Sequence, residues 1–112
     1  MASDLNFVTY VVDQINNAGK IEYRNMFGEY VVYSNGKVVA LICDNKLFVK
    51  PTIAGRLYIE NVVESPPYPG AKPAFLIEEK IEDADWLSQL IILTEKELPL
   101  PKKKRKSKKR SG

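Results

Sequence analysis

The chain has 112 residues, 45% hydrophobic and 28% charged, which is ordinary for a single soluble globular domain. No apolar run approaches the roughly 20 residues of a membrane-spanning helix, and the amino terminus lacks the basic flank and apolar core of a signal peptide, so we expect a cytoplasmic protein without membrane association. Because there is no histidine and only one cysteine, Cys43, the composition excludes an internal disulfide, the usual zinc sites and histidine-dependent catalysis, and we predict no metal or cofactor.

The formal net charge of +3 hides two oppositely charged parts. Residues 1–101 hold nine basic residues and all 14 acidic ones, a net charge of −5. The other eight basic residues follow close together, at Lys102, Lys103, Lys104, Arg105, Lys106, Lys108, Lys109 and Arg110. We therefore predict a folded domain over residues 1–98 and a disordered basic tail over residues 99–112, to which any affinity for polyanions belongs.

An amphipathic helix is predicted over residues 4–18, since apolar residues recur there at helical spacing. Ser3 is its expected N-cap and Gly19 the expected residue after its C-cap. Residues 20–26 alternate polar and apolar side chains, which predicts a strand, and Phe27-Gly28 is expected to form a bend or bulge after it.

Three further strands are predicted between residues 30 and 50, joined by turns at Asn35-Gly36 and Asp44-Asn45. Asn-Gly supplies the positive φ angles that a type I′ hairpin turn needs, so the register of the strands on either side is fixed locally. Together with the strand before them, these segments predict an antiparallel meander.

A short helix is expected from about residue 52 to residue 60, with Ile53, Leu57 and Tyr58 as the candidates to face inward and Gly55 weakening it. Four prolines between residues 66 and 73 predict an ordered loop, and residues 74–78 are predicted to form an edge strand. A last helix is expected over residues 83–97, ended by the prolines that follow it.

This order predicts an α+β fold of the type α-β(4)-α-β-α, in two layers. The antiparallel sheet has helices on one face, so its other face must meet water or a partner. A homodimer built on the uncovered sheet face or on an edge strand is also expected.

The predicted meander contains short elements at a characteristic spacing. They are Arg24 with Met26-Phe27-Gly28, Tyr30 and Tyr33, then Gly36-Lys37-Val38 with Ala40-Leu41-Ile42, and finally Leu47-Phe48-Val49-Lys50. In this pattern the chain resembles the N-terminal domain of the TfoX/Sxy family, over about residues 4–97. Glu29 and Val39 depart from it, where the family often has a second glycine and an aromatic residue.

The resemblance implies a two-layer fold shared in outline with small secretion chaperones, and a bacterial, non-enzymatic regulator linked to competence or transcription. We expect a stand-alone domain, because the chain is too short for the second domain of the named family members.

The motif residues Arg24, Met26, Phe27, Gly28, Tyr30, Tyr33, Gly36 and Lys37 are the main candidate site. In a functional interpretation they form an aromatic and basic surface that binds a peptide or stacks on nucleobases. In a structural interpretation Met26 and Tyr30 fill the core and Arg24 pairs with an acid. The sequence leaves both interpretations open.

Two other groups have a structural interpretation. Cys43 ends an apolar strand with no base nearby to lower its pKa, so we predict a buried, unreactive thiol. An acidic cluster could bind a divalent cation, but its spacing does not match an EF-hand, and we interpret it as helix capping and a solvated face. Its members are Glu78, Glu79, Glu82, Asp83 and Asp85.

The basic tail matches the pattern of a nuclear localisation signal. This interpretation does not apply to a bacterial family, because bacteria have no nucleus. What remains is a polycation expected to bind nucleic acid phosphates without reading sequence. The alternative is a solubilising or artificial extension.

Two functional classes follow from these observations. The preferred one is a non-enzymatic regulatory or interaction module, which binds an unidentified protein partner through the sheet face and nucleic acid through the tail. The alternative is a small enzyme with a histidine-free site near the Pro66–Pro73 loop. Two converging carboxylates or a strongly shifted lysine in a cleft would favour the enzyme, and a flat apolar patch would favour the module.

Overall fold

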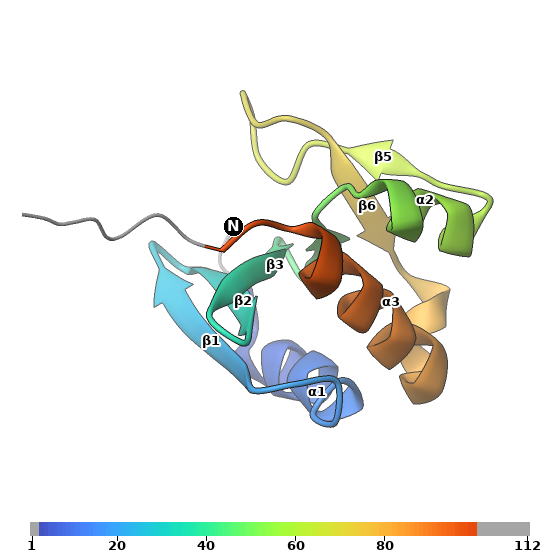
Figure 1. The fold of residues 1–112 in the computed structure, drawn as a ribbon. Coiled ribbons are helices and arrows are strands. Elements are labelled where there is room, and N and C mark those ends of the chain that lie inside the picture. The colour runs from blue at the N-terminus through green and yellow to red at the C-terminus, as the bar shows by residue number, and fades with distance from the viewer. Residues whose placement is uncertain (1–2, 101–112) are drawn as a thin grey trace, which may run out of the picture.

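The computed structural model describes residues 3–100, which form a two-layer α+β fold (Figure 1). Its elements are α1 (Leu5–Gln14), β1 (Ile21–Met26), β2 (Glu29–Ser34), β3 (Lys37–Cys43), β4 (Lys46–Val49), α2 (Ile53–Ile59), β5 (Glu64–Ser65), β6 (Ala74–Ile77), the 3-10 helix η1 (Glu79–Glu82) and α3 (Ala84–Glu97). The strands form one antiparallel sheet in the order β1-β2-β3-β4-β6-β5. The predicted fold class is confirmed.

One strand position was predicted wrongly. Residues 74–77 form β6, but β6 is not an edge strand, because the short strand β5 pairs with its outer side. The sheet edges are therefore β5 and β1. A two-residue strand in a proline-rich region has too little apolar periodicity to be recognised from sequence.

Three tight turns build the meander from β1 to β4. Both central residues of each turn have positive φ, as in a type I′ hairpin: 54° and 86° at Phe27-Gly28, 53° and 83° at Asn35-Gly36, and 53° and 57° at Asp44-Asn45. The turns expected at Asn35-Gly36 and Asp44-Asn45 are confirmed.

Phe27-Gly28 is a complete hairpin turn and not the bend or bulge that the sequence predicted. The register shift lies instead between Val32 and Tyr33, where β2 pairs with β3. Phenylalanine is a poor signal for a hairpin turn, because it seldom adopts positive φ.

Replacement of Gly36 by valine is expected to lower the free energy of unfolding by at least about 1 kcal/mol. Gly36 has a φ of 83° and open space around the position of a Cβ, so the cost is backbone strain without a steric clash. Chemical denaturation measures the change. Gly36→Asn should recover most of the loss, since asparagine tolerates positive φ, and coincident melts of Gly36→Val and the parent would contradict the turn assignment.

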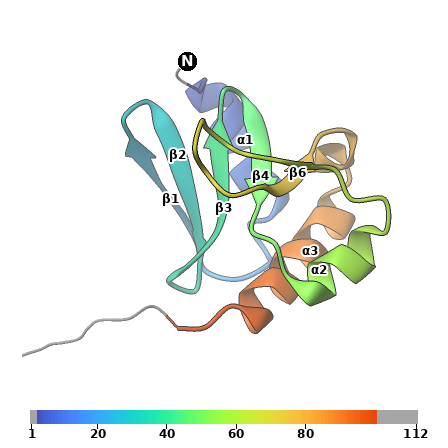
Figure 2. The same ribbon diagram turned by 90° about the horizontal axis from the view of Figure 1, so that it is seen from above.

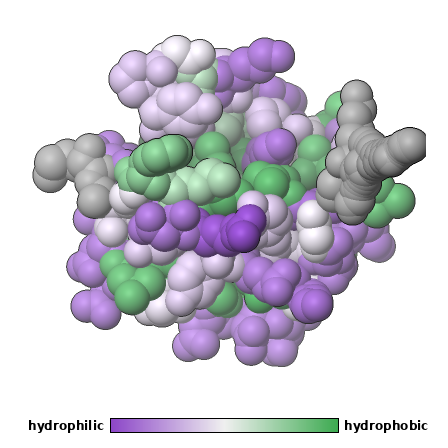
Figure 3. All heavy atoms as spheres, turned by 90° about the vertical axis from the view of Figure 1, so that its left-hand side faces the viewer, coloured by the Kyte–Doolittle hydropathy of each residue, from purple (hydrophilic) through white to green (hydrophobic). Residues whose placement is uncertain are grey.

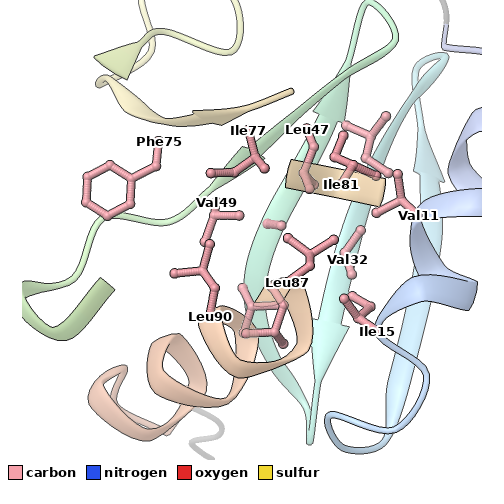
Figure 4. Close-up of a cluster of buried hydrophobic side chains, with 14 of the residues drawn as sticks. Val11, Ile15, Val32, Leu47, Val49, Phe75, Ile77, Ile81, Leu87 and Leu90 are labelled. Atoms are coloured by element: carbon pink, nitrogen blue, oxygen red, sulfur yellow. The ribbon is translucent and has the colours of Figure 1, made fainter. Parts of the chain in front are cut away.

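The hydrophobic core lies between one face of the sheet and the helices α1 and α3 (Figures 2 and 4). Alternate residues of β2, β4 and β6 point into it, as the period of two requires. Its fully buried members include Val8 and Val11 from α1 and Ile15 directly after it, Val32, Ile42, Leu47, Val49 and Phe75 from the sheet, and Leu87, Leu90 and Ile91 from α3.

The ends of α1 differ from the prediction. The N-cap is Asp4, whose carboxylate accepts a hydrogen bond from an amide of the first turn (3.0 Å). Ser3 is buried instead, and its hydroxyl donates to Glu29 Oε1 (2.8 Å). The helix ends with Ile15 as its C-cap, so Gly19 does not terminate it. Both Ser3 and Asp4 are good caps by type, and the contact with Glu29, distant in sequence, decides between them.

The first turn of α2 is capped from two sides. Thr52 Oγ1 accepts a hydrogen bond from the amide of Gly55 (2.9 Å). The carboxylate of Glu97, at the end of α3, accepts from the amides of Ala54 (2.9 Å) and Ile53 (2.8 Å), and these bonds lower the pKa of Glu97. The two helices are thus fixed to one another by a charged hydrogen-bonding group.

The inward side of α2 is formed by Gly55, with Tyr58 and Ile59 packed against the core, so the prediction is right for Tyr58 and wrong for Ile53 and Leu57. Both of those side chains are 74% exposed, whereas Gly55 is buried. A Cβ on Gly55 would lie 3.3 Å from the ring of Phe75 and 3.4 Å from Leu90 Cδ1. The glycine therefore lets α2 approach β6 and α3 closely, which is a tertiary requirement that helix periodicity does not show.

The outer face of the sheet, opposite the helices, is partly covered by the chain itself. The connection from β5 to β6 runs back across β4 toward β3 (Figure 2), and Pro66 and Tyr68 lie there beside a second cluster of buried residues. That cluster contains Cys43, Phe48 and Ala74. The predicted open face is therefore restricted to β1, β2 and part of β3.

Candidate functional site

The open part of the outer face is built on the β1–β2 hairpin. Val32 lies in the core, so Tyr23, which pairs with it, is on the helix side and Arg24 is on the outer side. The same alternation places Met26 and Tyr33 on the outer side. We name Arg24, Met26, Phe27 and Tyr33 the hairpin surface.

Phe27, at the tip of this hairpin, is the least expected side chain in the described structure. It is fully exposed, at 104% of the reference area, and its φ is 54°. Exposure of an aromatic ring and positive φ at a bulky residue both disfavour this arrangement. The neighbouring Met26 is 48% exposed. Neither residue is held in place by core packing.

Arg24 is also exposed. Among residues 3–100 the ion pairs are Lys37–Glu95 and Arg56–Glu64, so the acidic partner expected for Arg24 in the structural interpretation is not there. For Met26 and Arg24 that interpretation is wrong. For Tyr30 it is right, because its ring packs against the core and lies 6.0 Å from the ring of Tyr23.

The remaining motif residues have structural roles. Gly28 and Gly36 complete hairpin turns. Lys37 Nζ lies 2.9 Å from Glu95 Oε2 and donates to the Glu95 carbonyl (2.8 Å), which joins β3 to the end of α3. The hydrogen bond from Lys37 lowers the pKa of Glu95. The family motif is therefore mostly a folding motif, and the hairpin surface is the part of it that folding does not explain.

Glu29, which stands where the family often has a glycine, joins three segments. Its Oε1 accepts from the Ser3 hydroxyl and from the amide of Asp44 (3.1 Å), while the Ser3 hydroxyl accepts from the amide of Asn45 (3.1 Å). Burial, together with the charges of Glu29 and Asp44, raises the pKa of the Cys43 thiol. The prediction that Cys43 is buried is confirmed, and its environment opposes thiolate formation.

The acidic cluster acts in part as a helix cap, as predicted. Asp83 is the N-cap of α3 and accepts from the amide of Trp86 (3.1 Å), and Asp85 lies in the first turn. Within residues 3–100, no three Cys, Asp or Glu side chains converge in a way that could hold a metal ion.

The Pro66–Pro73 loop borders a shallow hollow of about 360 Å³. Its ionisable groups are Cys43, Asp44, Lys46 and Tyr68, so a single carboxylate lies there and no pair converges. The arrangement that would favour the enzyme alternative is thus not found at this loop.

A larger hollow of about 860 Å³, which the sequence did not indicate, lies between α2, β6 and η1. Tyr58 and Trp86 stack in its wall with ring centroids 5.3 Å apart, and Lys80 lies over the Trp86 ring. Burial and the charge of Asp83 raise the pKa of Tyr58. Its residues come from two stretches of the chain, 58–63 and 76–86, and no sequence motif joins them.

The predicted nucleic-acid-binding residues, Lys102 to Arg110, lie outside the described residues. None of the helices within residues 3–100 is long and apolar enough to cross a membrane.

The fold and the hairpin surface define a class of protein: a small two-layer domain whose unexplained features are exposed side chains on a sheet. A family model described as the TfoX N-terminal domain matches residues 13–98. The chain is also 38% identical over 112 residues to an "Uncharacterized 12.7 kDa protein in trpE 5′ region" of Spirochaeta aurantia, covering 100% of this chain and 97% of that protein. The chain belongs to the TfoX N-terminal domain family, as the resemblance predicted.

Proposed function

We propose that this protein is a non-enzymatic regulatory module that binds a protein partner through the hairpin surface, with a basic tail that adds sequence-independent affinity for nucleic acid. Its role would be in the regulation of competence or transcription, in the cytoplasm. Membership of the TfoX N-terminal domain family, which is not a family of enzymes, supports this proposal.

The exposure of Phe27 is the observation that carries the proposal. A fully exposed aromatic ring at positive φ is unfavourable in the isolated fold, because apolar area stays in water and the backbone is strained. No packing of the ring within the domain offsets these two costs. Met26 and Arg24 beside it add a flexible apolar chain and a guanidinium group, the residue types enriched where proteins bind one another. A partner that buries these three side chains would supply the missing stabilisation.

The test is a pull-down from a bacterial lysate with the parent chain, a Phe27→Ser variant and a Leu57→Ser variant. Leu57 is the matched control, because it is also an exposed apolar residue but lies on α2. We expect a partner that the parent and Leu57→Ser both capture and that Phe27→Ser loses by about tenfold or more. Equal recovery with Phe27→Ser, or loss with Leu57→Ser alone, would place the binding surface elsewhere.

For the tail, we expect weak binding to duplex DNA that is indifferent to sequence. If all eight charges met phosphates, log K against log salt would slope at about −7; we expect about −4 to −6, because a terminal segment seldom engages every charge. Deletion of residues 102–112 should abolish binding, since the rest of the chain has a net charge of −5. A salt titration of a fluorescent duplex measures both. If the truncated chain bound DNA equally well, the hairpin surface would be the nucleic-acid site.

A further inference from the structure

The two edges of the sheet are protected unequally. The β5 edge is two residues long, whereas β1 has six residues, pairs with β2 along its whole length without a register shift and contains no proline. Natural proteins shorten, bend or interrupt a free edge strand to prevent pairing with other chains. On the side of the molecule where β1 lies, hydrophobic patches are interspersed with hydrophilic side chains (Figure 3). The β1 edge is thus open to another strand.

The backbone groups that face outward from β1 follow from its pairing with β2. Opposed residues in an antiparallel pair alternate between hydrogen-bonded and non-hydrogen-bonded positions. The carbonyl of Lys20 accepts a hydrogen bond from the amide of Asn35 (2.9 Å), so Lys20 is at a hydrogen-bonded position opposite β2. Because these positions recur every two residues, the backbone groups of Glu22 and Arg24 also bond to β2. The backbone groups of the alternate residues Tyr23 and Asn25, and of Ile21, are therefore directed away from the sheet.

We propose that a second copy of this chain pairs with this edge, β1 antiparallel to β1, with the two-fold axis at Tyr23. In this register the Tyr23 residues of the two copies exchange hydrogen bonds, and Ile21 of each copy does so with Asn25 of the other. The two sheets then form one continuous sheet of twelve strands. The proposal goes beyond the proposed function, since Phe27, which carries that function, lies in the turn after β1 and outside the residues paired between the copies.

The charges on β1 select this register. With the axis at Tyr23, Glu22 of each copy lies opposite Arg24 of the other, so two opposite-charge pairs form on the outer face. With the axis moved by one residue, Glu22 would face Glu22, or Arg24 would face Arg24. Like charges directly opposite one another destabilise an antiparallel pair. Neither residue takes part in an ion pair among residues 3–100, so both are available.

The test uses the full chain, two charge reversals and their mixture. The parent should elute from light scattering with twice the 12.7 kDa mass at high micromolar concentration. Glu22→Arg and Arg24→Glu should each weaken the dimer by about tenfold or more, because each places two like-charge pairs at the interface. An equimolar mixture of the two variants should restore dimers with one copy of each, detected by native mass spectrometry. Circular dichroism should show both variants folded, because both side chains are exposed.

Tyr23→Pro provides a second, independent variant. Its amide is directed outward, so proline removes a hydrogen bond to the second copy and none to β2. We expect a folded monomer. A monomeric parent, or a mixture of the charge variants that stays monomeric, would overturn the proposal. A dimer unaffected by all three substitutions would show that the copies meet elsewhere. Neither outcome bears on the pull-down with Phe27→Ser, so this proposal and the proposed function fail separately.

Discussion

Replacement of Phe75 by alanine is expected to lower the free energy of unfolding by about 3–5 kcal/mol. The ring is 1% exposed and lies in β6, where the sheet meets α2 and α3. The guanidinium of Arg56, on α2, lies over the ring, with its carbon 5.3 Å from the ring centroid. Since a small domain is stable by only about 5–15 kcal/mol, this substitution should remove a large part of its stability.

Urea denaturation followed by the fluorescence of Trp86, the single tryptophan, measures the effect. The matched control is Phe27→Ala, the same chemical change at a fully exposed position, which should alter stability by less than about 0.5 kcal/mol. Equal losses for the two variants would contradict the burial of Phe75 or the exposure of Phe27. A stable Phe27→Ala variant that no longer binds its partner would separate the role of Phe27 in binding from any role in folding.

A valine in place of Gly55 is expected to cost about 2–4 kcal/mol. Intrinsic helix propensity alone predicts a slight gain, because glycine is the poorer helix former. However, a Cβ at this position would lie 2.6 Å from Thr52 Oγ1, so the side chain that caps α2 must move. The loss of that cap is worth about 1 kcal/mol, and the forced separation of α2 from Phe75 and Leu90 about 1–3 kcal/mol more.

The sign of the change in the free energy of unfolding distinguishes the two effects, because helix propensity predicts a gain for Gly55→Val and close packing predicts a loss. Leu57→Val, on the exposed face of the same helix, is the control and should stay within about 0.5 kcal/mol of the parent. Thermal and chemical denaturation of both variants measure the difference. A Gly55→Val variant as stable as the parent would show that α2 does not approach β6 and α3 as closely as described.

The local features of the fold were determined by the sequence. Asn35-Gly36 can adopt the two positive φ angles of its turn at little cost, so the hairpin on either side of it follows from residues adjacent in the chain. The last helix likewise has its cap at Asp83 and apolar residues at helical spacing, including Leu87, Leu90 and Ile91. Signals of this kind are readable because the interactions that matter lie within a few residues.

Other features were decided only in the tertiary structure. Ile53 and Leu57 have the spacing of a buried helix face, yet the close approach of α2 to Phe75 and Leu90 requires a residue without a side chain, so Gly55 faces inward. Met26 is exposed because β1 is an edge strand and the helices cover the opposite face, although an apolar residue in a strand predicts burial. Each outcome depends on which elements pack against one another in the folded protein. The residue pattern of a single helix or strand does not specify its neighbours.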